Sequence, residues 1–269
     1  MGVITINRER CRKDNICMAV CPMDLFREGS SGFPETIPEA QNDCIDCGHC
    51  QAACPHEALT LMDDFHHECA QVVTTQTLNW ETVENLVKGR RSIRKYRDEP
   101  IPRATLDRLF DMVRWAPTAR NVQPVNWTMV EDRQQVRVLA GMVVEWMQGK
   151  DLYPGLETAW EKGRDLILRD APHLAIAHAP VHGLSPAIDC TIAVTTLELA
   201  ASALGFGGCW AGIFMAAAND YAPLIELLQL PEDHNVYGAL MLGYPHLRYQ
   251  RIPQRKKAGI SWFKNDPVS

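Results

Sequence analysis

The sequence predicts an α+β protein in two parts, a small cysteine-rich part over residues 1–66 and a larger part over 78–269, with a linker over 67–77. Two observations support this division. Seven of the ten cysteines fall before residue 55, among short β-prone runs and turn residues. The remainder alternates helical apolar spacing with short apolar runs typical of strands. An apolar share of 46% and a charged share of 22% are those of ordinary globular domains.

The most informative stretch is residues 44–55, which read CIDCGHCQAACP with the spacing C-x2-C-x2-C-x3-C-P. This spacing is typical of iron–sulfur ligation, because three closely spaced thiolates meet one cluster while the fourth reaches a second. A zinc site is the alternative interpretation. Zinc, however, needs four ligands from two separated knuckles and gives no reason for the final proline.

Residues 11–22, CRKDNICMAVCP, repeat this pattern 33 residues earlier, with Asp14 where a second cysteine is expected. The repeated unit resembles the bacterial two-cluster ferredoxin module, which implies a ferredoxin-like fold over residues 1–66. The resemblance also implies two clusters whose ligands cross between the repeats. One, a 4Fe-4S cluster, would be held by Cys21, Cys44, Cys47 and Cys50, and the other by Cys11, Asp14, Cys17 and Cys54.

Asp14 leaves the second cluster open to three interpretations. A carboxylate is a harder and weaker ligand for iron than a thiolate, so that corner should be labile. The site is either a 4Fe-4S cluster with Asp14 bound, a 3Fe-4S cluster with Asp14 idle, or empty beside a solvated Asp14.

The charge of the chain is concentrated in its first part. Residues 1–66 contain 5 Lys and Arg against 11 Asp and Glu, a net of −6 that equals the formal charge of the whole chain. This favours docking of a redox protein with a basic patch, such as a ferredoxin donor, and argues against nucleic-acid binding. Simple solubility of an acidic domain explains it equally well.

No run approaches the ~20 apolar residues of a membrane span, and the N-terminus lacks the apolar core of a secretory signal. Ten cysteines in a chain with a cluster motif and no export signal indicate a reducing compartment. We therefore predict a cytoplasmic protein without membrane contact. His66, His67 and Cys69 lack further ligands at suitable spacing, so we interpret them as linker residues.

Local patterns predict the elements in order. Val, Ile and Thr predict a strand over 3–6, and glycines and prolines predict turns and a hairpin over 28–42. Asn79 is suited to cap a helix that begins at Trp80. The remaining expectations are helices over 102–116, 135–147 and 157–169, strands over 125–130, 173–179 and 236–242, a buried helix over 189–204, and a Gly-rich loop over 207–212.

Residues 90–96, RRSIRKY, gather cations and a hydroxyl just past a helix end, which indicates either a solvated basic edge or an anion site. Residues 115–124 then read WAPTARNVQP. Together these motifs resemble the FMN-dependent nitroreductase family, whose fold is an α/β sandwich. The chain departs from the family pattern at Thr118, where serine is usual, and at Val125, where an aromatic residue often follows.

The resemblance implies the cofactor site. The phosphate would be held by a basic motif and by a C-terminal cation, Arg255 or, as second choice, Lys257, while the backbone of Ala211 and Gly212 would lie against the flavin ring. Asn121 and Gln123 would address the ribityl chain or ring edge, and the family homodimer places flavin at the interface. The residues of the basic motif are Arg90, Arg91, Ser92 and Arg94, and those that reach the partner's flavin are Pro117, Thr118 and Ala119.

We therefore expect an FMN-dependent oxidoreductase in which the clusters deliver single electrons to FMN, which reduces nitroaromatic or quinone-like small molecules. The flavin carries the chemistry, so no catalytic side chain is expected. The donor is a reduced ferredoxin or NAD(P)H. Alternatives are dehalogenation or flavin or ene reduction on the same fold, and a non-enzymatic relay between protein partners. Cys190 and Cys209 are interpreted as packing residues, with a redox thiol as the alternative.

Overall fold

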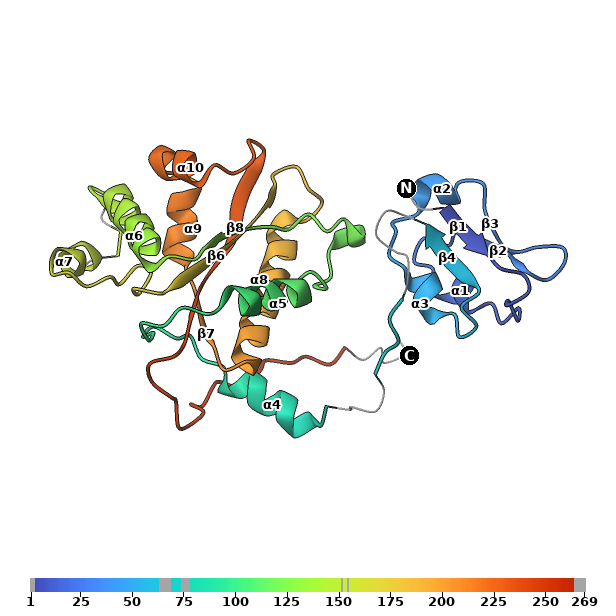
Figure 1. The fold of residues 1–269 in the computed structure, drawn as a ribbon, viewed down its shortest axis with the longest axis horizontal. Coiled ribbons are helices and arrows are strands. Elements are labelled where there is room, and N and C mark those ends of the chain that lie inside the picture. The colour runs from blue at the N-terminus through green and yellow to red at the C-terminus, as the bar shows by residue number, and fades with distance from the viewer. Residues whose placement is uncertain (1–2, 63–68, 74–77, 151, 154, 264–269) are drawn as a thin grey trace, which may run out of the picture.

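The computed structural model describes residues 3–62, 69–73, 78–150, 152–153 and 155–263 (Figure 1). His66 and His67 lie outside the described residues, and Cys69 is exposed. The N-terminal part pairs its first and last strands antiparallel, with Ile6 opposite Leu59, and adds a separate two-stranded hairpin. Its elements are β1 (Val3–Ile6), α1 (Ile16–Val20), β2 (Phe26–Glu28), β3 (Pro34–Thr36), α2 (Ala40–Asp43), α3 (His49–Ala53) and β4 (Leu59–Met62).

The 33-residue sequence repeat is also a repeat of backbone conformation. Helices α1 and α3 begin and end 33 residues apart. Left-handed residues recur at the same interval: Lys13 (φ 58°) matches Asp46 (φ 49°), and Asn15 (φ 59°) matches Gly48 (φ 70°). The predicted strand at 3–6 and the hairpin within 28–42 are both confirmed. A small core of Cys17, Leu25, Phe26, Ala40, Cys50 and Leu59 holds this part together.

The larger part is built on a four-stranded antiparallel sheet in the order β5-β6-β8-β7. The strands are β5 (Asn126–Val130), β6 (His173–Pro180), β7 (Gly207–Trp210) and β8 (His234–Gly243). The predictions for 125–130, 173–179 and 236–242 are confirmed. The prediction of a loop throughout 207–212 is wrong, because residues 207–210 form β7 and pair with β8 from Gly207 opposite Gly243 to Trp210 opposite Leu240.

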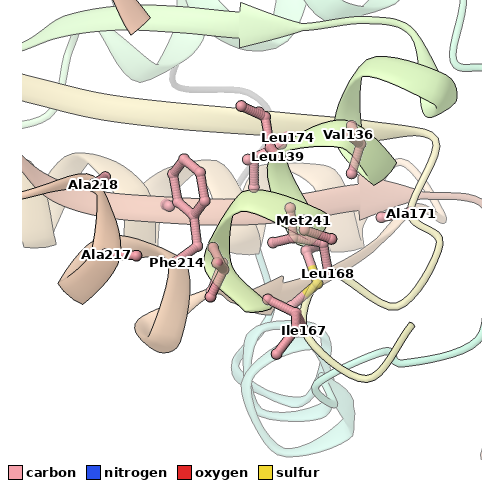
Figure 2. Packing of buried hydrophobic residues seen from close by; sticks show 14 of the residues in the cluster. Val136, Leu139, Ile167, Leu168, Ala171, Leu174, Phe214, Ala217, Ala218 and Met241 are labelled. Carbon is pink, nitrogen blue, oxygen red and sulfur yellow. The ribbon is translucent and has the colours of Figure 1, made fainter. Parts of the chain in front are cut away.

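Helices cover both faces of this sheet, because β6 is apolar at consecutive positions. Leu174 and Ile176 pack with α6 (Arg133–Met147) and α9 (Gly212–Ala218), where Phe214 is fully buried (Figure 2). Ala175 and Ala177 face the opposite layer, formed by α5 (Arg103–Val113) and α8 (Pro186–Ala203). The part is therefore an α/β sandwich, and α8 is its central helix as its apolar composition predicts.

One helix prediction differs from the structure, and two short helices of the larger part were missed. Helix α7 (Leu156–Glu161) ends eight residues before the end of the helix predicted over 157–169. There the buried Asp165 accepts backbone hydrogen bonds at 2.8–2.9 Å from Ile167, Leu168 and Asp170, which holds a turn in place of a helix. The short helices α9 and α10 (Ala222–Leu228) were not predicted.

Helix α4 (Trp80–Gly89) confirms the predicted cap, since Asn79 Oδ1 accepts from Thr82 N at 2.8 Å. Within the described part of the chain, no helix combines the length and apolar character that a membrane crossing requires.

Candidate functional site

The first cysteine set surrounds one cavity in the N-terminal part. Cys21, Cys44, Cys47 and Cys50 all line it, together with apolar residues of β1, β2 and β4. The pKa of Cys50 is raised to about 11, chiefly by burial, with the neighbouring thiols of Cys21, Cys47 and Cys44 acting in the same direction. The structure thus brings Cys21 of the first repeat to the three closely spaced cysteines of the second, as the crossed assignment predicts.

The second cysteine set is partly assembled. Burial raises the pKa of Cys17, and Cys11 and Asp14 act in the same direction, so these three groups are neighbours. Asp14 Oδ1 accepts from Ile16 N at 3.2 Å, and Oδ2 lies 3.7 Å from His56 Nε2. His56 follows Cys54 by two residues and was not predicted; nothing in its spacing distinguishes it from a solvated histidine.

The two cysteines that cross between the repeats have matching surroundings. Leu25 N donates to Cys21 Sγ at 3.5 Å, and Ala58 N donates to Cys54 Sγ at 3.4 Å. The two donors, Leu25 and Ala58, are 33 residues apart, and so are the two acceptors, Cys21 and Cys54. Hydrogen bonds to cluster-ligating sulfur tune the potential of a cluster, so both sites are equipped alike.

This arrangement fits a polynuclear cluster better than a zinc ion. Among the described residues, no three His, Cys, Asp or Glu side chains converge as closely as one metal ion requires. Four cysteines instead stand around a cavity lined by backbone and apolar groups. A cube of iron and sulfide separates its thiolate ligands more widely than a tetrahedral zinc ion does.

The basic motif lies along the free edge of β7. Ile93 N donates to Gly208 O at 2.9 Å, and Tyr96 OH donates to Ile93 O at 2.7 Å. Gly207 permits this approach, because a Cβ there would stand 2.3 Å from Ile93 Cγ1. The glycine therefore serves the packing of the motif on the sheet.

The charges of the motif are arranged around Glu198 of α8 and Cys209 of β7. Arg90 Nη1 lies 2.6 Å from Glu198 Oε1, and the two side chains are 21% and 7% exposed. Burial raises the pKa of Cys209, while Arg94, Arg169 and a hydrogen bond with Ser92 lower it. Ser92 and two arginines thus act on one buried thiol.

Arg169 was not predicted as a site residue. It precedes β6 in a left-handed conformation (φ 63°), and the pairing of β6 and β7 on either side of β8 brings Cys209 near it. An isolated arginine before a strand carries no sequence signal of this kind. Arg91 is partly buried in the same segment.

The loop at 117–123 is fixed by internal contacts. Ala119 N donates to Asp189 Oδ1 at 3.0 Å, and Gln123 N donates to Thr118 Oγ1 at 2.9 Å. Threonine therefore supplies the hydroxyl that the usual serine would supply. Asn121 donates into the N-terminal part, to Ile45 O at 3.2 Å and Asp46 O at 3.0 Å. Pro117 and the Gln123 side chain are exposed.

The remaining predicted residues lie in different settings. Ala211 is buried, whereas a Cβ at Gly212 would meet no atom within 4 Å, so the backbone there opens outward. Arg255 and Lys257 are exposed in an extended segment, and within the described chain the structure shows no ion pair that ties them to the basic motif. Cys190 is fully buried, and burial raises its pKa to about 12, as expected of a packing residue.

Comparison with known proteins gives two family matches. Residues 87–244 match the Nitroreductase family and residues 9–59 match the 4Fe-4S dicluster domain. An FMN reductase (NAD(P)H) of Bacillus subtilis is 27% identical over 186 residues, 67% of this chain and 72% of that protein. A 5,6-dimethylbenzimidazole synthase of Rhodospirillum rubrum is 26% identical over 207 residues, 69% of this chain and 92% of that protein.

Among solved structures, an FMN-bound nitroreductase from Bacteroides fragilis aligns with a TM-score of 0.57 and 25% identity, covering 68% of this chain and 98% of that one. The Nitroreductase family match spans the basic motif and all of β5 to β8, and the cysteine repeats precede it. The chain therefore belongs to the nitroreductase family, with a 4Fe-4S dicluster domain joined ahead of the flavin-type sandwich.

Proposed function

We propose that the protein is an iron–sulfur flavoprotein oxidoreductase that binds FMN and two iron–sulfur clusters. The observation that carries this proposal is the presence in one chain of two built sites. One is the four-cysteine cavity of the N-terminal part, and the other is the cation group on the edge of β7. A one-electron carrier and a phosphate-binding flavin site in one chain fit a reductase supplied with single electrons.

The cation group is suited to a phosphate monoester. Ser92 hydrogen-bonds with Cys209, and the charges of Arg94 and Arg169 both act on that thiol. Arginine guanidinium groups donate in pairs to phosphate oxygens, and a hydroxyl adds one more donor. Arg90 forms an ion pair with Glu198, so the pair carries no net charge, but the remaining N–H groups of Arg90 can still donate to the phosphate. Arg91 is also proposed to face the phosphate.

The flavin ring would lie beside Gly212, where no side chain intervenes. When bound, FMN takes up electrons singly or as hydride and passes a pair to the substrate. The chain's own residues bind and orient the cofactor, and we propose no side chain as a proton donor or acceptor. We propose nitroaromatic or quinone-like small molecules as substrates, with a reduced ferredoxin or NAD(P)H as donor.

We propose that two chains form a homodimer with the flavin at their interface. Apolar side chains stand exposed around α4 and the start of α8: Trp80 is 74% exposed, Leu184 61% and Ile188 62%. Exposed apolar groups of this size are typical of surfaces that a partner covers.

The first test is the iron, sulfide and flavin content of anaerobically purified protein, with electron paramagnetic resonance before and after reduction. About eight irons and one FMN per chain are expected from two cubane clusters, and about seven with a signal in the oxidised protein if Asp14 is idle. Absence of FMN would overturn the proposal. Steady turnover of a nitroaromatic or quinone acceptor separates the enzyme from an electron relay.

A matched pair of variants tests the flavin site. Arg94→Ala should weaken FMN binding about 10-fold to 100-fold, because one charge-assisted contact to phosphate is lost. Arg108→Ala removes an equally exposed arginine from α5 and should leave FMN binding unchanged. Equal FMN affinities for the two variants would remove Arg94 from the site.

A further inference from the structure

Two hydrogen bonds join the sandwich to the cluster-binding loop. Asn121 Nδ2 donates to Ile45 O at 3.2 Å and to Asp46 O at 3.0 Å, across 76 and 75 residues of sequence. Ile45 and Asp46 stand between the ligands Cys44 and Cys47. A primary amide has two N–H donors, and two carbonyl acceptors lie within hydrogen-bond distance of this one. Asn121 is therefore committed as a donor to the N-terminal part in this arrangement.

The loop that carries Asn121 is built to hold this position. Asp189 of α8, only 2% exposed, accepts from Ala119 N at 3.0 Å and so ties the loop to the core. Arg120 (φ 49°), Asn121 (φ 55°) and Gln123 (φ 52°) are all left-handed. Such conformations cost free energy outside glycine, least for Asn, and persist only where surrounding contacts impose them.

The loop on the other side of the contact lines the first cluster cavity. Ile45 and Gly48 contribute to that cavity together with the cysteines on either side of them. Of the two residues whose carbonyls accept from Asn121, Ile45 lines the cavity of Cys21, Cys44, Cys47 and Cys50, and Asp46 lies directly between Ile45 and the lining residue Cys47.

The repeat provides an internal comparison, because the second site has an equivalent loop 33 residues earlier. Lys13 occupies the place of Asp46 and is left-handed like it. Its Nζ donates to Ser31 O at 2.8 Å and lies 4.2 Å from the Phe33 ring centroid. That loop packs against the β2–β3 hairpin of its own part. Two equivalent loops therefore have different partners, and the one at Cys44–Cys47 meets the sandwich.

We propose that residues 118–123 form the docking site of the iron–sulfur part, with Asn121 as its positioning residue, so that the cluster held by Cys21, Cys44, Cys47 and Cys50 is the one proximal to the flavin domain. This assignment of electron entry rests on the proposed function. Each transfer removes one electron from that cluster and adds one electron to the flavin. A reduced iron–sulfur protein then donates one electron to the cluster and is itself oxidised.

Asn121 is also expected to address FMN, and the experiment separates that role from docking. Asn121→Asp keeps the shape and the tolerance of left-handed φ but removes the donor and faces both carbonyls with a carboxylate. Asn126→Asp is the matched control, because Asn126 Nδ2 donates only locally, to Pro124 O at 3.0 Å. Asn121→Gln restores the amide donors.

The first readout is amide hydrogen exchange of residues 44–48 in the iron-loaded protein. Asn121→Asp should speed exchange there about 10-fold, the effect of losing one to two net hydrogen bonds. Asn121→Gln should recover part of the protection, and Asn126→Asp should change nothing. Unchanged exchange in Asn121→Asp would overturn the docking site.

The second readout is the stopped-flow rate at which the flavin bleaches after the clusters are reduced by dithionite. Measured on the FMN-loaded chains only, the rate for Asn121→Asp should be about 10-fold lower, in proportion to the lost docking. Loss of FMN with unchanged exchange would make Asn121 a flavin ligand and overturn the proposal. If the wild-type protein contains no FMN, the proposed function is overturned. The docking proposal can still be tested in that case, because the hydrogen-exchange experiment does not need FMN.

Discussion

Removal of Arg90 tests how the structure holds the basic motif. Arg90 Nη1 lies 2.6 Å from Glu198 Oε1, and the carboxylate is 7% exposed. Arg90→Ala leaves this buried carboxylate without its partner, which costs about 3 kcal/mol, the lower end for a broken buried pair, because Arg90 itself is partly solvated. For a domain of this size, that loss corresponds to a fall in melting temperature of about 6–12 °C.

The pH dependence gives the prediction its sign. Burial raises the pKa of Glu198 above its ordinary 4.5, and Arg90 opposes this shift. Without Arg90 the pKa rises further, so the charged form destabilises the fold above that pKa. Below about 4.5 the carboxyl is protonated in folded and unfolded chains alike, and the cost disappears. The loss in free energy of unfolding caused by Arg90→Ala should therefore be complete near neutral pH and become smaller as the pH falls.

The assay is thermal unfolding followed by circular dichroism, on FMN-free and FMN-loaded protein, because a bound ligand adds its own stabilisation. Arg90→Ala/Glu198→Gln should recover to within about 1 kcal/mol of wild type, since no buried charge remains. Arg114→Ala is the control, because its pair with Asp111 is 64% and 71% exposed. Its effect should stay within about 0.5 kcal/mol. A double variant as unstable as Arg90→Ala, or a deficit independent of pH, would refute the reasoning.

Three further changes have defined outcomes. Asp14→Cys completes the second C-x2-C-x2-C set, so iron analysis should approach about eight per chain and any signal of the oxidised protein should disappear; an unchanged iron content would contradict Asp14 as the weak corner. His178 has Nδ1 2.7 Å from His234 Nδ1, and burial and His234 lower its pKa to about 4. Stability from His178 is then complete above its ordinary 6.5 and lost as pH falls toward 4, by about 3 kcal/mol, and a histidine NMR titration with a midpoint near 6.5 would contradict this. Gly207→Ala places a Cβ 2.3 Å from Ile93 Cγ1 and should cost about 1–3 kcal/mol in denaturant unfolding, whereas Gly259→Ala, with no atom within 4 Å, should cost nothing comparable.

Helices and strands with strong local signals follow the sequence closely. The Asn79 cap, the apolar run of β6 and the uniformly apolar α8 each occur where their patterns predict. The exceptions have identifiable causes. β7 contains Gly207 and Gly208, which lower strand propensity, and pairing with β8 overrides that preference. The expected helix beyond Glu161 gives way to a turn capped by Asp165.

The sequence alone predicted the cluster ligands and the phosphate motif, because these predictions depend on spacing within a few residues and on a repeat of fixed period. The tertiary structure decided which distant groups meet them. Glu198 reaches Arg90 across 108 residues, Arg169 reaches Cys209 through strand pairing, and Asn121 reaches the Cys44–Cys47 loop across about 75. No local pattern encodes such contacts, since each depends on how separate elements pack against one another.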